Sequence, residues 1–155
     1  MTEIKIERIT SKEMLARCAS VLVDAYNAEP WNDSWTQEKA LEKLECFYSS
    51  PKFIGFIAVK DQDAVGALIG NIEPYYTGDY FYLKEMFVSS KAQKRGIGKT
   101  LMQTLKTQLG LIDIRQVVLF TSKDHFPFDF YQKARFNTMD GMCMMHFESG
   151  GIVED

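Results

Sequence analysis

Apolar residues change their spacing along this chain, and the order of those changes restricts the fold more than any other feature. Stretches with the three- and four-residue spacing of amphipathic helices predict helices at residues 11–29, 36–50, 97–109 and 126–134. The first begins with the capping-box spacing Thr-Ser-Lys-Glu at 10–13, and Pro127 fits the first turn of the last.

Between these helices the chain is rich in β-branched and aromatic residues. We predict strands at residues 3–8, 53–59, 64–72, 80–88, 116–121 and 142–147. The order β, α, α, β, β, β, α, β, α, β mixes hairpins with helical crossovers. It therefore predicts an α+β (mixed α/β) fold with a mixed central sheet and helices on both faces.

The size and composition exclude several classes of protein. A chain of 155 residues corresponds to a single domain, expected here over residues 1–155. A net charge of −3 does not suit a broad basic face for nucleic acid. The three scattered cysteines and two histidines lack the spacing of a metal site, so we expect no metal. No apolar leader or membrane-length run is present, so we expect a cytoplasmic protein without a membrane partner.

The residues with the clearest chemical meaning form a basic loop at 91–99, Lys-Ala-Gln-Lys-Arg-Gly-Ile-Gly-Lys. It has four cationic side chains and no acid, in a chain whose overall charge is negative. Its two glycines lie at the start of the predicted helix at 97–109. Free N–H groups at such a helix start favour an anion, so the loop predicts a site for phosphate or pyrophosphate.

Two common phosphate-binding motifs do not fit this loop. A nucleotide-binding P-loop that ended at Gly98-Lys99-Thr100 would need glycine at 93, where the chain has Gln93. A dinucleotide fingerprint that started at Gly96 would need glycine at 101, where Leu101 belongs to the apolar face of the helix.

The pattern Gln93-x-x-Gly96-x-Gly98, with a strand before it and a helix after it, resembles the GNAT superfamily of acyl-CoA-dependent N-acetyltransferases. The order of elements resembles that family over nearly the whole chain. Residues 83–88 resemble its fourth strand, and residues 130–136 resemble its closing Y-x-x-x-G-F segment, with Arg135 at the usual glycine. The resemblance implies the GNAT acyl-CoA N-acyltransferase fold.

The resemblance also implies that acetyl-CoA is the cofactor. Its pantetheine would pair with the backbone of Phe87 and Val88, and its pyrophosphate would lie on amides of the basic loop. The implied cofactor-binding residues are Phe87, Val88, Gln93, Lys94, Arg95, Gly96, Ile97, Gly98, Lys99 and Thr100. For Lys94 and Arg95, a solvated basic surface is an equally good interpretation of the side chains.

Glu85 and Tyr131 are the candidate catalytic residues. Glu85 occupies the position of the family's general base. A carboxylate on an apolar strand is costly to bury without a partner, which favours a functional role. The alternative is a strand-edge glutamate paired with Lys84 or another cation. Tyr131 matches the family's general acid, which gives its proton to the CoA sulfur, and the alternative is an aromatic residue of the core.

The resemblance places the acceptor amine between the loop that joins the first two helices and the loop before the fourth strand. These loops carry the candidate substrate-binding residues Trp31, Trp35, Tyr75 and Tyr76, to which Glu85 is added. Acidic and aromatic walls suit a small cationic amine through carboxylate pairing and cation–π contact.

We therefore expect an N-acetyltransferase that acts on a primary amine of a small molecule by direct attack in a ternary complex. The alternative is a non-catalytic acyl-CoA-binding or sensor module. The methionines at 139, 142, 144 and 145 indicate either pliable packing or the surface of a homodimer.

Overall fold

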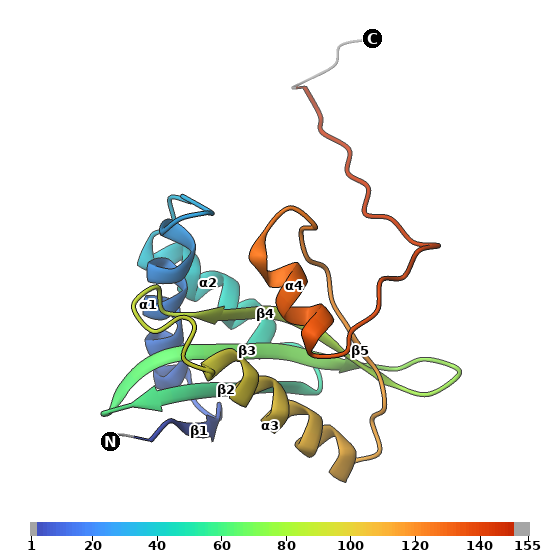
Figure 1. Cartoon of the computed structure of the whole chain (residues 1–155), viewed down its shortest axis with the longest axis horizontal. Coiled ribbons are helices and arrows are strands. Elements are labelled where there is room, and N and C mark those ends of the chain that lie inside the picture. Colours follow the sequence, from blue (N-terminus) through green and yellow to red (C-terminus); the bar gives the residue numbers. More distant parts are fainter. Residues whose placement is uncertain (1–2, 151–155) are drawn as a thin grey trace.

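The computed structural model describes residues 3–150, which form one five-stranded sheet with helices on both faces (Figure 1). The strands lie in the order β1-β2-β3-β4-β5, antiparallel throughout except that β5 is parallel to β4. The elements are β1 (Lys5–Arg8), α1 (Lys12–Asn27), α2 (Gln37–Tyr48), β2 (Phe53–Lys60), β3 (Asp63–Glu73), β4 (Tyr80–Val88), α3 (Ile97–Leu111), β5 (Val117–Val118) and α4 (Phe126–Lys133). The predicted mixed sheet and fold class are confirmed.

Two hydrophobic clusters hold the helices to the sheet. The apolar faces of α1 and α2 pack on one face of the sheet, with Leu15 and Leu44 fully buried. On the other face, α3 and Tyr131 of α4 pack around the fully buried Phe81 and Leu101. Figure 1 shows α3 crossing the sheet on the side opposite α1 and α2. The sheet is thus covered on both faces, which explains the long apolar runs of β2 and β3.

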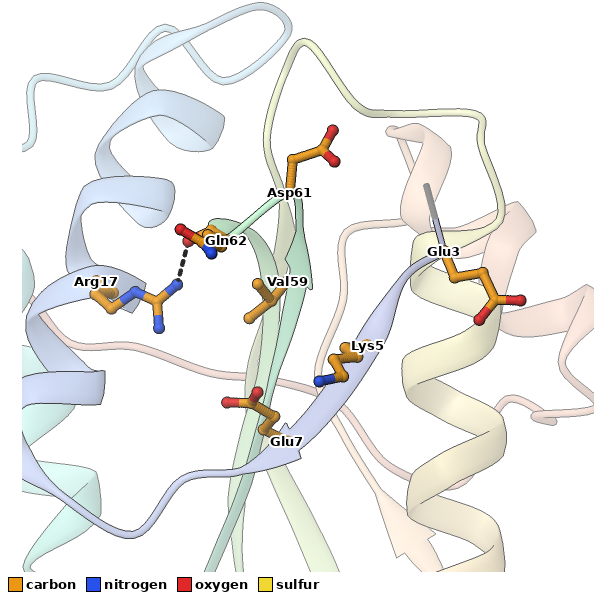
Figure 2. A pocket seen from close by; sticks show the side chains of 7 residues that line it. All are labelled: Glu3, Lys5, Glu7, Arg17, Val59, Asp61 and Gln62. Atoms are coloured by element: carbon orange, nitrogen blue, oxygen red, sulfur yellow. Dashed lines mark hydrogen bonds between the residues drawn. The ribbon is translucent and has the colours of Figure 1, made fainter. Parts of the chain in front are cut away.

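A pocket lies beside β1, at the edge of the sheet far from β5 (Figure 2). Within it, Arg17 of α1 donates a 2.7 Å hydrogen bond to the carbonyl oxygen of Gln62 in the β2–β3 turn. Its other lining residues are Glu3, Lys5, Glu7, Val59 and Asp61. None of the residues predicted to bind cofactor or acceptor lines this pocket.

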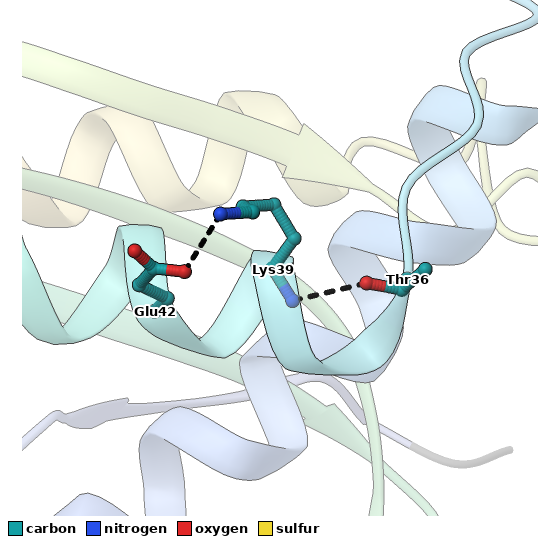
Figure 3. Close-up of polar contacts among 3 residues, drawn as sticks. All are labelled: Thr36, Lys39 and Glu42. Atoms are coloured by element: carbon teal, nitrogen blue, oxygen red, sulfur yellow. Dashed lines mark hydrogen bonds and ion pairs between the residues drawn. The ribbon is translucent and has the colours of Figure 1, made fainter.

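Helix α2 begins at the capping residue that the sequence indicates, Thr36, whereas α1 is capped by Ser11, one residue after the first position of the predicted capping box. Ser11 Oγ accepts a hydrogen bond from Met14 N, and Thr36 Oγ1 accepts one of 3.1 Å from Lys39 N. One turn later, Lys39 Nζ forms an ion pair with Glu42 at 2.9 Å (Figure 3). The Thr36 cap fixes where α2 leaves the α1–α2 loop, which carries Trp31 and Trp35.

A β-bulge in β4 changes which face its side chains point to. Ile69 pairs with Glu85, whereas the next residue, Gly70, pairs with Leu83, so Lys84 has no partner on β3. Before the bulge, Leu83 packs in the α3 cluster, and after it Phe87 packs in the α1 cluster. Because of this extra residue, Glu85 lies on the face covered by α1 and α2.

The C-terminal part of the chain differs from the prediction. The strand predicted at 116–121 is reduced to Val117–Val118, and the prediction of a strand at 142–147 is wrong. That segment pairs with no strand of the described chain, and its side chains are exposed. The apolar content predicted a strand, but a strand also needs a neighbour. Figure 1 shows the segment extending away from the sheet, where it has none.

Candidate active site

The edge of β4 that faces β5 is paired over only a short stretch. Phe81 and Tyr82 pair with Val117 and Val118, and residues 83–88 have no strand partner on that side within the described chain. The free stretch includes Phe87 and Val88. Its N–H and C=O groups can therefore accept an extended ligand as an additional strand.

The basic loop ends at this edge and has an unusual backbone. Lys94 and Gly96 both have positive φ angles, of 64° and 80°. The first hydrogen bond of α3 runs from Thr100 N to the carbonyl of Gly96, at 3.0 Å. No described group accepts a hydrogen bond from the N–H groups of residues 96–99. With the exposed side chains of Lys94, Arg95 and Lys99 around them, these donors are able to hold an anion.

The side chains of three other predicted cofactor-binding residues in this loop contact the protein itself. Ile97 is only 2% exposed and anchors the start of α3 in the core, so only its N–H can reach a ligand. Thr100 Oγ1 donates to the carbonyl of Gly96 at 2.9 Å. Gln93 Nε2 donates to the carbonyl of Val88 at 3.3 Å, which ties the loop to the end of β4.

The two glycines of the loop are required for different reasons. A Cβ at Gly96 would meet nothing within 4 Å, but the positive φ there is unfavourable for any other residue. At Gly98, a Cβ would lie 3.2 Å from Phe130 Cε1 and 3.3 Å from Met86 Cε. Gly96 is therefore required for the positive φ of the turn, and Gly98 allows α3 to pack closely against α4 and β4.

Asp24 on α1 holds the point where the chain leaves β4. Its Oδ2 accepts hydrogen bonds from Ser89 Oγ at 2.9 Å, Ser90 N at 2.8 Å and Ser90 Oγ at 3.0 Å. Partial burial alone would raise the pKa of Asp24, but the hydrogen bonds from Ser90 and Ser89 outweigh it, so the pKa is lowered. Asp24 thus holds the two serines that lead from β4 into the basic loop.

Glu85 is a largely desolvated carboxyl group. Burial raises its pKa from 4.5 to about 7, while the positive charge of Lys43 and a hydrogen bond from Tyr26 act in the opposite direction. The described chain shows no ion pair to it, and Lys84 instead places its Nζ 3.4 Å from the ring centroid of Tyr82. The interpretation of Glu85 as the partner of Lys84 is therefore wrong. Near neutral pH, Glu85 can both accept and release a proton.

Tyr131 of α4 lies near Glu85. It is 8% exposed, and its Oη is 3.8 Å from Met86 Sδ. Burial, and after it the charge of Glu85, raises the pKa of Tyr131, so the phenol keeps its proton. Its ring also packs edge-on against Phe130 and Phe136. Tyr131 is thus a core residue whose protonated hydroxyl lies within electrostatic reach of Glu85.

Tyr26 is a site residue that the sequence analysis did not identify. Its hydroxyl is 3.3 Å from the carbonyl oxygen of Met86 and hydrogen-bonds Glu85. Burial and the charge of Glu85 raise the pKa of Tyr26. Tyr26 belongs to the helix predicted at 11–29, but nothing in the sequence indicated that a residue of this helix meets the carboxyl group of a distant strand.

The predicted acceptor residues fall into two groups. Trp31 packs edge-on against Tyr26, and its centroid is 4.7 Å from that of His125 at the start of α4. This links the α1–α2 loop to the Glu85 site. Lys43 Nζ lies 5.5 Å from the centroid of the Trp35 ring, in a cation–π contact.

The exposed Tyr75 and Tyr76, in contrast, contact each other, and Tyr75 also contacts Tyr80. They stand between the end of β3 and the start of β4, away from Trp31. Tyr26 thus connects Trp31 to Glu85. The ring contacts of Tyr75 and Tyr76 do not include Trp31 or Tyr26.

Comparison with known proteins identifies the family. The model of the acetyltransferase (GNAT) family matches residues 16–136. Within residues 3–150, no helix is long and apolar enough to cross a membrane. No curated protein sequence is significantly similar to the chain.

Several solved structures share the fold. An integron cassette protein from the mobile metagenome of V. cholerae has a TM-score of 0.79 at 19% identity, over 96% of this chain and 94% of that one. An aminoglycoside acetyltransferase from an uncultured soil metagenomic sample, in complex with trehalose, has a TM-score of 0.73 at 20% identity, over 94% and 95%. Aminoglycoside N-acetyltransferase AAC(6')-Iy in complex with CoA has a TM-score of 0.73 at 17% identity, over 97% of both chains.

The sheet with a partly unpaired fourth strand, the glycine-containing loop before α3 and the family match together define an acetyl-CoA-dependent N-acetyltransferase. The chain belongs to the GNAT family of acetyltransferases.

Proposed function

We propose that the protein transfers the acetyl group of acetyl-CoA to a primary amine of a small cationic acceptor, by direct attack in a ternary complex. The observation that supports this most is Glu85, a carboxyl group with a pKa of about 7 on the strand whose edge is free for the cofactor. A pKa close to working pH is what a general base requires.

The residues of the chain fit acetyl-CoA. The free N–H groups of residues 96–99 and the surrounding cations suit a pyrophosphate, and the backbone of Phe87 and Val88 suits an amide-bearing arm. Lys94 and Arg95 would add charge from their exposed side chains. When bound, acetyl-CoA supplies the activated acetyl group as a thioester.

Each proton that the reaction moves has a candidate in the chain. Glu85 takes the proton from the acceptor ammonium and so frees the attacking amine. Tyr26, hydrogen-bonded to Glu85, orients that carboxylate. Tyr131 keeps its proton at Oη and gives it to the departing sulfur, and the second proton that the attacking nitrogen loses as the amide forms returns to Tyr131. The raised pKa of Tyr131 keeps this donor protonated throughout the working range of pH.

The acceptor is expected to be a cation because the loop beside Trp31 is acidic and aromatic. Glu29 and Asp33 flank this tryptophan in the sequence, and its ring is half-buried. Tyr75 and Tyr76 can contribute only to an acceptor long enough to extend along β4 from Glu85. Among proteins of this fold, an aminoglycoside acetyltransferase from a soil metagenomic sample has been crystallised with sisomicin and with trehalose. Aminoglycosides therefore belong in the panel of acceptors to be tested.

Release of free thiol from acetyl-CoA, measured with a panel of aminoglycosides, polyamines, amino acids and peptides, tests the proposal. We expect acceptor-dependent thiol release that is lost in Glu85→Gln and retained in Glu7→Gln, an exposed glutamate on β1. Saturable CoA binding with no acceptor-dependent thiol would indicate a non-catalytic acyl-CoA-binding module and contradict the enzymatic proposal.

A further inference from the structure

Lys43 of α2 is a partly buried cation whose charge the protein leaves uncompensated. Within residues 3–150, its Nζ forms neither an ion pair nor a hydrogen bond. It lies instead 5.5 Å from the ring centroid of Trp35 and 5.7 Å from that of Phe47. These rings hold the ammonium group in place but carry no negative charge. A partly buried charge without a partner has a desolvation cost, which an anionic ligand would offset.

The tryptophan beneath this ammonium group is anchored at three points. The side chain of Asn27 binds both backbone groups of Trp35, since Oδ1 accepts from Trp35 N at 2.8 Å and Nδ2 donates to Trp35 O at 3.0 Å. The indole Nε1 donates to Asp33 Oδ2 at 3.1 Å. Asp33 thus binds the indole and forms no ion pair with Lys43. The support for Lys43 is therefore preformed, which lowers the entropic cost of binding a ligand there.

Two consecutive residues of α1 join this support to the Glu85 site. Tyr26 hydrogen-bonds Glu85, and the next residue, Asn27, anchors Trp35. The positive charge of Lys43 also reaches Glu85 and acts to lower its pKa. The two side chains nevertheless form no ion pair. A cation and a carboxyl group therefore lie within electrostatic reach of each other, and neither neutralises the other by direct contact.

We infer that Lys43 is a specificity-determining residue, which binds a carboxylate of the acceptor while Glu85 binds its amine. The acceptor would then be an amino acid or a related amine that carries a carboxylate. This inference rests on the proposed function and narrows its substrate class. Opposite charges on the acceptor match the opposite charges of Lys43 and Glu85, whereas a polycation would bring positive charge against Lys43. Aminoglycosides, with several amines and no carboxylate, should therefore be poorer acceptors than amino acids.

Matched pairs of acceptors test the inference, each an amino acid or short peptide and its carboxamide. The ratio of kcat/KM for the carboxylate over the carboxamide should fall about tenfold in Lys43→Met, because a hydrogen bond to a charged group is lost. The difference in amine basicity within a pair is the same for every variant and cancels. Lys43→Arg keeps the charge and should keep the ratio. Lys39→Met should also keep it, because Lys39 is an exposed lysine of the same helix that pairs with Glu42 (Figure 3). Circular dichroism and the unfolding temperature check that each variant is folded.

The pairs also separate binding of a carboxylate from the effect of Lys43 on Glu85. A changed Glu85 alters kcat/KM by the same factor for both members of a pair, whereas a lost carboxylate contact affects only one. An unchanged ratio in Lys43→Met overturns the inference, even if both activities fall. An aminoglycoside that outperforms every carboxylate-bearing acceptor overturns it too. In both cases, acceptor-dependent thiol release leaves the proposed function standing.

If no acceptor releases thiol, the proposed function fails, and the same pairs are compared by calorimetry with CoA present. The carboxylate member should then bind the wild type about tenfold more tightly than it binds Lys43→Met, while the carboxamide binds both alike. Equal binding of the carboxylate to the two proteins, or no binding at all, overturns the inference.

Discussion

Replacing Glu85 with glutamine should make the protein more stable at neutral and alkaline pH, and it should also remove the proposed general base. Burial raises the pKa of Glu85 from 4.5 to about 7, so in the folded protein the carboxyl group loses its proton later than in the unfolded chain. As the pH rises above 4.5, the unfolded state releases this proton first and is favoured. The stability that the protonated carboxyl group contributes is complete below pH 4.5 and is lost as the pH rises through about 7.

The size of this effect follows from the two pKa values. A difference of one in pKa between the folded and unfolded states corresponds to about 1.4 kcal/mol. The free energy of unfolding should therefore fall by about 3 kcal/mol relative to Glu85→Gln between about pH 4.5 and about pH 7.5. Urea unfolding at half-unit steps of pH measures it. Glu7→Gln, at an exposed position, should give a curve parallel to that of the wild type. If the wild-type and Glu85→Gln curves are also parallel, Glu85 is not desolvated, and the argument for its role as base fails.

Three further substitutions test other parts of the site. Tyr131→Phe should lower kcat about 10²-fold by removing the proton donor, with little change in KM for acetyl-CoA, and an unchanged kcat would refute that role. Asp24→Asn removes an acceptor for the hydrogen bonds of Ser89 and Ser90, and should raise KM for acetyl-CoA about tenfold while kcat stays within about twofold. Arg135 has a φ of 73° at the end of α4, so Arg135→Gly should raise the free energy of unfolding by about 0.5–1 kcal/mol, whereas Arg135→Ala should not.

The features of the fold that follow from local spacing could be predicted from the sequence. The start of α2 at Thr36 follows from its side-chain oxygen, and the capping box predicts the start of α1 one residue before its observed cap, Ser11. Helix α3 follows from its four-residue repeat of isoleucine and leucine. The anion site at residues 91–99 stays a prediction, which rests on charge and glycine as local properties of that loop. Arg135 was marked by resemblance as a usual glycine position, and its positive φ supplies the physical reason.

Features that depend on contacts between distant segments could not be predicted. The bulge at Lys84 decides which helices Glu85 faces, yet a bulge leaves no clear mark in a run of aromatic and apolar residues. The contact of Tyr26 with Glu85 joins α1 to β4 and depends on that bulge. The segment at 142–147 has the composition of a strand, but its partner is not fixed by composition, and within the described part of one chain it has none.

The central claim is that the main-chain N–H groups at the start of α3 bind the pyrophosphate of acetyl-CoA. Titration of ¹⁵N-labelled protein with coenzyme A, followed by nuclear magnetic resonance, tests it most directly. We predict large, saturable shifts of the amide signals of Gly96 and Gly98, together with those of Phe87 and Val88. Shifts confined to the pocket beside β1, or no shift at the two glycines when CoA is saturating, would contradict the account.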